Sequence, residues 1–201
     1  MSQKSKLLSG GSWALSKIFA VQLINIGAIA ILSRQLSPAD FGLVALANVA
    51  LRFFGVLSSQ GINQFVIYDN SPNHQEKLNA AFWLNLIVSI GSVLIGIAAI
   101  PLISNFYSEP LLATILLVLL LRFPLDVTSK LFDSILHKSL DFKAIEIRDF
   151  ALQLSTALLG VIMALNGYGV WSLIVPSLIA APIRLFLACQ IVKWRPKTKL
   201  Y

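Results

Sequence analysis

Long apolar runs separated by short polar connections constrain this chain more than any other feature of its sequence. A helix needs about 20 mostly apolar residues to cross a bilayer, and all but one of the six runs reach that length. The sequence therefore predicts an all-α, polytopic membrane protein whose six transmembrane helices form a single lobe over residues 1–201. The predicted spans are 11–33, 41–60, 80–104, 111–136, 150–165 and 170–192. The fifth is the shortest and could extend toward Arg148 or Asn166.

The composition agrees with a chain that is buried mostly in lipid. Hydrophobic residues make up 57% of the sequence and charged residues only 12%, and the mean hydropathy is +0.79. An ordinary soluble domain carries about 25% charged residues. So little polar surface could not cover the apolar core of a water-soluble enzyme, and so apolar a chain is not typical of a disordered protein.

Local signals mark several helix ends. The run 11–33 is too long for the core of a signal peptide, and no small-residue cleavage site follows it, so it is predicted to be a transmembrane helix. Pro38 is expected to begin the second helix, Pro124 to kink the fourth, and residues 166–169 to form a sharp turn. The two longest polar connections are predicted over 61–79 and 137–149. Three glycines are expected to allow close helix packing: Gly27, Gly91 and Gly96.

The distribution of Lys and Arg predicts the orientation of the chain. Of its 16 basic residues, the predicted outer connections hold only Arg34, whereas the segments on the side of the N-terminus hold eleven. Because basic residues concentrate on the cytoplasmic side of membrane proteins, both termini are expected to be cytoplasmic. The net charge of +7 then reflects topology and attraction to anionic lipid, and no nucleic-acid partner is expected. The eleven are Lys4, Lys6, Lys77, Lys130, Lys138, Lys143, Arg148, Lys193, Arg195, Lys197 and Lys199.

The sequence shows no pattern typical of a metal site, a cofactor site or an enzyme active site. Cys189 is the single cysteine, and His74 and His137 lie in polar connections away from any cluster of carboxylates. There is no glycine-rich phosphate loop, no nucleophile elbow and no HExxH helix. We therefore expect neither a metal nor a cofactor, and no enzymatic activity.

Four basic residues and one acid lie deep within the predicted spans. Each such charge costs about 2.5–3.5 kcal/mol at the centre of a membrane helix, which favours a polar interior or a water-filled cavity. At a rise of 1.5 Å per residue, Arg52 and Arg122 lie about 16 Å below the outer ends of their helices. Arg184 lies about 21 Å down its helix, and Lys17 about 9 Å from the cytoplasmic end of the first span. Asp126 is the candidate for ion coupling.

A structural and a functional interpretation stay open for most of these charges. Lys17 and Arg184 could extend to the inner head groups and keep only their alkyl stems in lipid. Arg122 and Asp126 are one helical turn apart and could simply neutralise each other. Arg52 has no acid three or four residues away and lies too deep to reach a head group easily. It is the strongest candidate for a functional charge.

Polar amides in the first three spans fit a shared polar interior, although each could equally form a hydrogen bond between helices. These amides are Gln22, Asn25, Asn48 and Asn85. A cavity walled by guanidinium and amide groups suits a large anion, and phosphate or diphosphate is the natural partner of a fork-shaped guanidinium. The residues thus indicate a transporter for an anion.

The connecting segments carry a series of short motifs. The first outer turn reads LSRQLSPADFGLV over 32–44. It is followed in order by GINQFVI (61–67), FWLN (82–85), LDF (140–142), NGYGVW (166–171) and WRP (194–196). No one of these is specific alone, but the ordered series covers the whole chain. In this series the chain resembles the Wzx-type polysaccharide flippases, most closely the branch that exports colanic acid, teichuronic acid and related polymers.

The resemblance implies membership of the multidrug/oligosaccharidyl-lipid/polysaccharide exporter superfamily. Such proteins have two six-helix lobes facing a central cavity, and they move undecaprenyl-diphosphate-linked oligosaccharide across the bacterial inner membrane by alternating access. The resemblance further implies that Arg52 binds the diphosphate and, by depth and charge only, that Arg122, Arg184 and Lys17 do. Because family members have twelve or more spans, this chain is expected to be an N-terminal part of a longer transporter or one of two paired copies. The expected partners are lipid-linked oligosaccharide diphosphate, the phospholipid bilayer and a second six-helix lobe.

Three other functions stay open on the sequence alone. A cation-coupled drug exporter of the same superfamily would need several intramembrane acids, and only Asp126 qualifies. A membrane enzyme of polymer assembly would need paired carboxylates at the membrane surface. The segment 137–149 contains Asp141, Glu146 and Asp149, but the bases beside them are more typical of a solvated, salt-bridged helix face. The third alternative function is that of a membrane scaffold without transport activity.

Overall fold

The computed structural model describes residues 21–68, 73–138, 142–192 and 194–196, and all regular structure in these residues is α-helical. After a helical segment over 21–35, the helices are α2 (Pro38–Tyr68), α3 (His74–Tyr107), α4 (Pro110–Lys138), α5 (Phe142–Leu165) and α6 (Trp171–Ile191). Among the described helices, four are long and apolar enough to cross a membrane, namely α3 to α6. The prediction of an all-α, multi-pass membrane protein is confirmed at this level. Part of the first predicted span lies outside the described residues.

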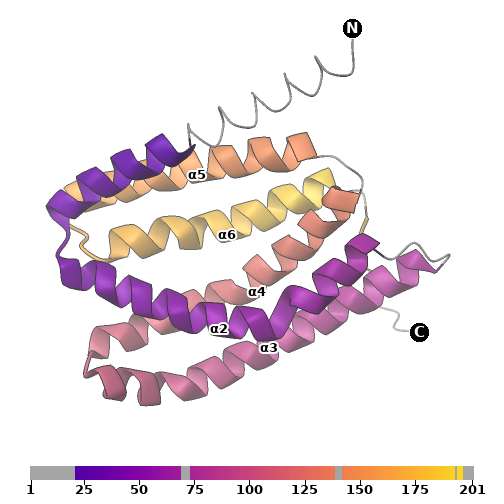
Figure 1. The fold of residues 1–201 in the computed structure, drawn as a ribbon, viewed down its shortest axis with the longest axis horizontal. Helices are drawn as coiled ribbons and strands as arrows, with labels where there is room; N and C mark the ends of the chain where they lie inside the picture. Colours follow the sequence, from indigo (N-terminus) through magenta and orange to yellow (C-terminus); the bar gives the residue numbers. More distant parts are fainter. Residues whose placement is uncertain (1–20, 69–72, 139–141, 193, 197–201) are drawn as a thin grey trace, which may run out of the picture.

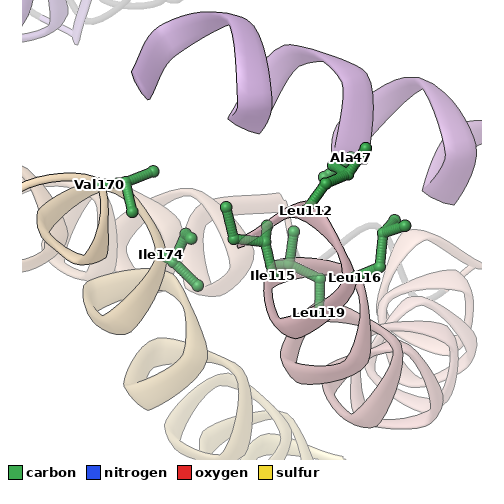
Figure 2. Packing of buried hydrophobic residues seen from close by; sticks show 7 residues of the cluster. All are labelled: Ala47, Leu112, Ile115, Leu116, Leu119, Val170 and Ile174. Atoms are coloured by element: carbon green, nitrogen blue, oxygen red, sulfur yellow. The ribbon is translucent and has the colours of Figure 1, made fainter. Parts of the chain in front are cut away.

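Helix α4 is the central helix of the lobe and contacts α2, α3, α5 and α6. The segment 21–35 runs alongside α5 (Figure 1), where Leu32 packs with Ala164 and Leu173. A buried apolar cluster joins α4 to α2 and to the start of α6 (Figure 2). Its members are Ala47, Leu112, Ile115, Leu116, Leu119, Val170 and Ile174. Large apolar side chains on the outer faces, such as Leu94 and Leu102 of α3, stay exposed, as expected where lipid surrounds the helices.

The ends of two helices differ from the predicted spans at the connection 61–79, which is mostly helical. Helix α2 continues to Tyr68 and α3 begins at His74. The reason is that Val66 is buried in a cluster with Leu78 and residues of α4, so this polar stretch has one apolar helical face. A low average hydropathy therefore hid a helical stretch that packs on the lobe through a few apolar side chains.

The predicted polar connection 137–149 is likewise helical over much of its length, because α5 begins at Phe142 and not at residue 150. Ile145 is buried against Phe132 and Leu136 of α4, which holds this first part of α5 on the lobe. Arg148, counted above with the inner connections, is consequently buried inside the helix bundle.

The turns that flank the helices follow the local signals. Pro38 is the first residue of α2 as predicted, and Ser37 and Asp40 cap the helix reciprocally. The Ser37 amide donates to Asp40 Oδ2 at 2.9 Å, and the Asp40 amide donates to Ser37 Oγ at 3.3 Å. The predicted sharp turn before α6 is confirmed, with positive φ angles of 80° at Gly167 and 55° at Gly169.

Of the three glycines expected at close helix contacts, Gly96 alone has one among the described residues. A Cβ atom at Gly96 would lie 2.7 Å from a methyl carbon of Leu120 on α4, whereas one at Gly27 or Gly91 would meet no described atom within 4 Å. The prediction is therefore confirmed for Gly96, whereas the described residues give no close contact at the other two.

We expect Gly96→Ala to lower the free energy of unfolding by about 1–3 kcal/mol, the usual cost of overpacking. Leu120 is only 1% exposed and belongs to a buried cluster with Val93 and Phe123, so a shift of its side chain must displace packed neighbours. Gly91→Ala, on the same helix, is the matched control and should be neutral or stabilising by up to about 1 kcal/mol, because Ala has the higher helix propensity. Thermal unfolding of the purified variants in detergent compares them, and equal losses would contradict the packing argument.

Candidate functional site

A cleft of about 360 Å³ lies between the segment 21–35 and helices α4, α5 and α6. All four of these elements contribute polar residues to its lining, and the rest of the lining is largely small or apolar. The polar and charged lining residues are Asn25, Arg122, Asp126, Gln153, Thr156, Ser172, Ser177 and Arg184. The cleft is thus a polar interior within the lobe, as a chain with charges inside its spans requires.

Two residues without long side chains shape the cleft where α5 meets α6. Pro176 has no amide hydrogen, so the carbonyl of Ser172 loses its helical partner one turn earlier. Gly160 of α5 faces this carbonyl, and a Cβ atom there would lie only 3.0 Å from the Ser172 oxygen. The missing side chain lets the two helices approach closely at this level.

Arg122 and Asp126 form the predicted pair on α4. The Arg122 Nε atom lies 2.8 Å from Asp126 Oδ2, and both side chains are partly buried at the cleft wall. The two side chains are therefore placed as the structural interpretation expects, so that each charge neutralises the other across one helical turn.

A second group of charges joins α4, α5 and α6 through Arg148, whose side chain is only 2% exposed. Its Nη1 atom lies 2.8 Å from Asp133 Oδ1 as an ion pair. Its Nε and Nη2 atoms donate hydrogen bonds to Asp149 Oδ1 at 3.0 and 2.9 Å. Arg184 Nε lies 3.7 Å from the same Asp149 oxygen. The order Asp133, Arg148, Asp149, Arg184 alternates in sign and has no net charge.

Sequence reasoning missed that Arg148 is buried and paired with acids behind the cleft, although a signal for it exists. Ile145, Arg148 and Leu152 are all buried and are spaced three and four residues apart, which places them on one face of α5. A base in the apolar stripe of a helix is expected to have a buried acidic partner.

Arg52 lies elsewhere in the lobe. It is near the middle of α2, its side chain is exposed, and it forms no ion pair within the part of the chain that the structure describes. It does not line the cleft. The structure thus brings together Arg122, Asp126 and Arg184 and separates Arg52 from them, while Lys17 lies outside the described residues.

The four amide side chains expected in a shared polar interior lie in different surroundings. Gln153 of α5 donates a hydrogen bond from Nε2 to Asn25 Oδ1 at 2.9 Å, so Asn25 both lines the cleft and joins two helical segments. Asn48 donates to the Val44 carbonyl of its own helix at 2.9 Å. Gln22 is exposed, and Asn85 is fully buried. Asn25 alone among the four lines the cleft.

Comparison with known proteins places the chain in a family. Residues 31–201 match the family described as polysaccharide biosynthesis protein. The succinoglycan biosynthesis transport protein ExoT of Rhizobium meliloti is 26% identical over 170 residues, which make up 84% of this chain and 34% of that protein. The lipopolysaccharide biosynthesis protein WzxC of Escherichia coli is 29% identical over 147 residues, 72% of this chain and 29% of that protein. No solved structure matches the chain significantly.

The chain spans about a third of the length of the curated relatives that it matches. The family match nevertheless covers most of the chain, and the relatives agree with the exporters that its motifs resemble. This chain therefore belongs to the polysaccharide biosynthesis protein family, among the relatives of Wzx-type polysaccharide exporters.

Proposed function

We propose that this chain is the N-terminal lobe of a transporter that moves undecaprenyl-diphosphate-linked oligosaccharide across the bacterial inner membrane for cell-surface polysaccharide biosynthesis. The observation that carries the proposal is Arg52. It is an exposed guanidinium in the middle of a 31-residue helix, without an ion-pair partner among the described residues, in a chain whose relatives are named for polysaccharide transport and biosynthesis.

The energetic argument concerns what offsets the cost of these charges in a membrane. Carboxylates do so for Arg122 and Arg148. For Arg52 the compensating charge must come from outside the described lobe. A diphosphate fits this role, because its oxygens accept two parallel charge-assisted hydrogen bonds from one guanidinium.

The surroundings of Arg52 support a second lobe as a partner. Asn48, Val49, Arg52 and Phe53 are all exposed and lie on one face of α2. In the proposed transporter this face lines the cavity between this lobe and a second six-helix lobe. Residues 11–33 and α2 complete six spans, both termini are cytoplasmic, and the protein acts without a cofactor and is not an enzyme.

Depletion of the protein in the bacterium that encodes it tests the proposed function. Surface polysaccharide should fall while lipid-linked oligosaccharide accumulates on the cytoplasmic face of the membrane, and re-expression should reverse both changes. A polymer-assembly enzyme would instead leave the lipid-linked intermediate absent. Normal surface polysaccharide after depletion, with a new sensitivity to cationic dyes, would favour a drug exporter.

We further propose that Asp126 couples transport to an ion gradient, because its carboxylate faces the cleft beside Arg122. Asp126→Asn is expected to lower export about tenfold, equivalent to about 1.4 kcal/mol. The remaining export should no longer respond to collapse of the proton or sodium gradient. Arg122→Gln/Asp126→Asn, which removes both charges, should not restore export. Full recovery in this double variant would show that the pair is structural only.

A further inference from the structure

Asp149 of α5 lies between two guanidinium groups that hold it unequally. Arg148 donates two hydrogen bonds to Asp149 Oδ1, at 3.0 and 2.9 Å. Arg184 approaches the same oxygen only to 3.7 Å, which is too long for a hydrogen bond. The carboxylate is therefore bound by Arg148 and is only a loose neighbour of Arg184.

The loosely held guanidinium is the one that faces the cleft. Arg184 lines the cleft and its side chain is 37% exposed, whereas Arg148 is almost fully buried. The other two charged lining residues, Arg122 and Asp126, neutralise each other at 2.8 Å. Within the described part of the chain, Arg184 is thus the charged lining residue with the weakest compensation, because the 3.7 Å approach to Asp149 is its single ion pair.

Asp133 fixes the position of Arg148 from the opposite side. The Arg148 Nη1 atom lies 2.8 Å from Asp133 Oδ1 on α4, while the Nε and Nη2 edge faces Asp149. A guanidinium held by carboxylates on two edges cannot rotate without breaking one of these contacts. Arg148 accordingly holds the Asp149 carboxylate by two hydrogen bonds, at a distance from Arg184 of 3.7 Å that is too long for a hydrogen bond.

We propose that Arg148 is a positioning residue that restrains Asp149 and so leaves Arg184 free to bind a phosphate group in the cleft. Arg148 itself does not line the cleft. The inference deepens the proposed function and rests on it for the diphosphate nature of the anion. If Arg148 is removed, Asp149 is free to close on Arg184 and to compete with the anion for its hydrogen-bond donors.

Binding of farnesyl diphosphate and of inorganic pyrophosphate to the purified protein, expressed from its complete gene, tests the proposal. The variant Arg148→Gln/Asp133→Asn removes one positive and one negative charge, so the net charge is unchanged while Asp149 loses its strong partner. We expect it to raise the dissociation constant about fivefold, within the range of a gained ion pair. Asp149→Asn alone should lower the dissociation constant severalfold.

Adding Asp149→Asn to the double variant separates positioning from a general structural role. The triple variant should recover at least wild-type affinity, because no carboxylate remains to occupy Arg184. A structural defect would not be repaired by a further substitution in the same charge group. Unchanged affinity in the double variant, or weaker binding in Asp149→Asn, would overturn the proposal, and Asp149→Asn keeps it testable if the double variant fails to fold.

The two probes and the depletion experiment test the role of Arg148 and the proposed transport function separately. Tighter binding of farnesyl diphosphate than of pyrophosphate assigns the site to a lipid-borne diphosphate, whereas equal affinity assigns it to the diphosphate group itself, and both support the proposal. Absence of binding to the wild-type protein would overturn it. If the variants follow the expected order but depleted cells export normally, the proposed function fails and the role of Arg148 stands.

Discussion

Arg52→Ala is expected to lower the export of surface polysaccharide at least about tenfold, since loss of a bidentate, charge-assisted contact is worth about 1.4 kcal/mol or more. The guanidinium lies mid-helix and exposed, where a diphosphate can reach it. Its removal should not reduce the amount of protein in the membrane, because a charge at the centre of a membrane helix costs about 2.5–3.5 kcal/mol on insertion. Export and protein level are measured together in cells that express the protein from its complete gene.

Two matched variants sharpen this result. Arg52→Lys keeps the charge but not the planar fork of donors, so an intermediate level of export is expected. Arg34→Ala removes the same charge from an exposed position near the end of the segment 21–35 and should leave export unchanged. Normal export in Arg52→Ala would remove the central role that we assign to this residue.

Arg148→Met is expected to cause the largest loss of stability. It leaves Asp133 and Asp149 without their main partner, and breaking a buried ion pair by removing one member costs about 3–5 kcal/mol. The free energy of unfolding in detergent measures the loss. Arg148→Met/Asp133→Asn should recover part of it, because the more deeply buried of the two carboxylates left behind is replaced by a neutral amide.

Arg184→Met is the matched control for this loss. It removes the other guanidinium near Asp149, but that contact is 3.7 Å long and partly exposed, so the expected cost is only about 0–1 kcal/mol. Equal free energies of unfolding for Arg148→Met and Arg184→Met would show that the buried contacts of Arg148 contribute no more to stability than the exposed contact of Arg184.

The apolar runs of the sequence were sufficient to predict the helical, membrane-embedded fold, because length and hydropathy decide between lipid and water. They did not predict the helix ends at Tyr68 and Phe142. In both places a helical stretch that contains polar residues also has a buried apolar side chain that packs on the lobe. This side chain is Val66 in α2 and Ile145 in α5. The mean hydropathy of a sequence window does not reveal such a packing residue, whereas the three- and four-residue spacing of apolar side chains does.

In the candidate site, likewise, contacts within one helix could be predicted from the sequence, whereas contacts between distant segments could not. The pairing of Arg122 with Asp126 was readable because both lie on one turn of one helix. The hydrogen bond of Gln153 with Asn25 was not, since 128 residues separate the two in the chain. The approach of Arg184 to Asp149 likewise depends on how α5 packs against α6. Only the buried stripe around Arg148 offered a sequence signal for this second charge group.

The most direct test of the transport function is translocation in a reconstituted system. Proteoliposomes that contain the protein from its complete gene would be loaded with a fluorescently labelled, undecaprenyl-diphosphate-linked oligosaccharide on one leaflet. Our account predicts that the wild-type protein moves the label to the other leaflet and that Arg52→Ala, reconstituted at equal density, does not. Equal rates in the two proteins, or no translocation above protein-free liposomes, would contradict it.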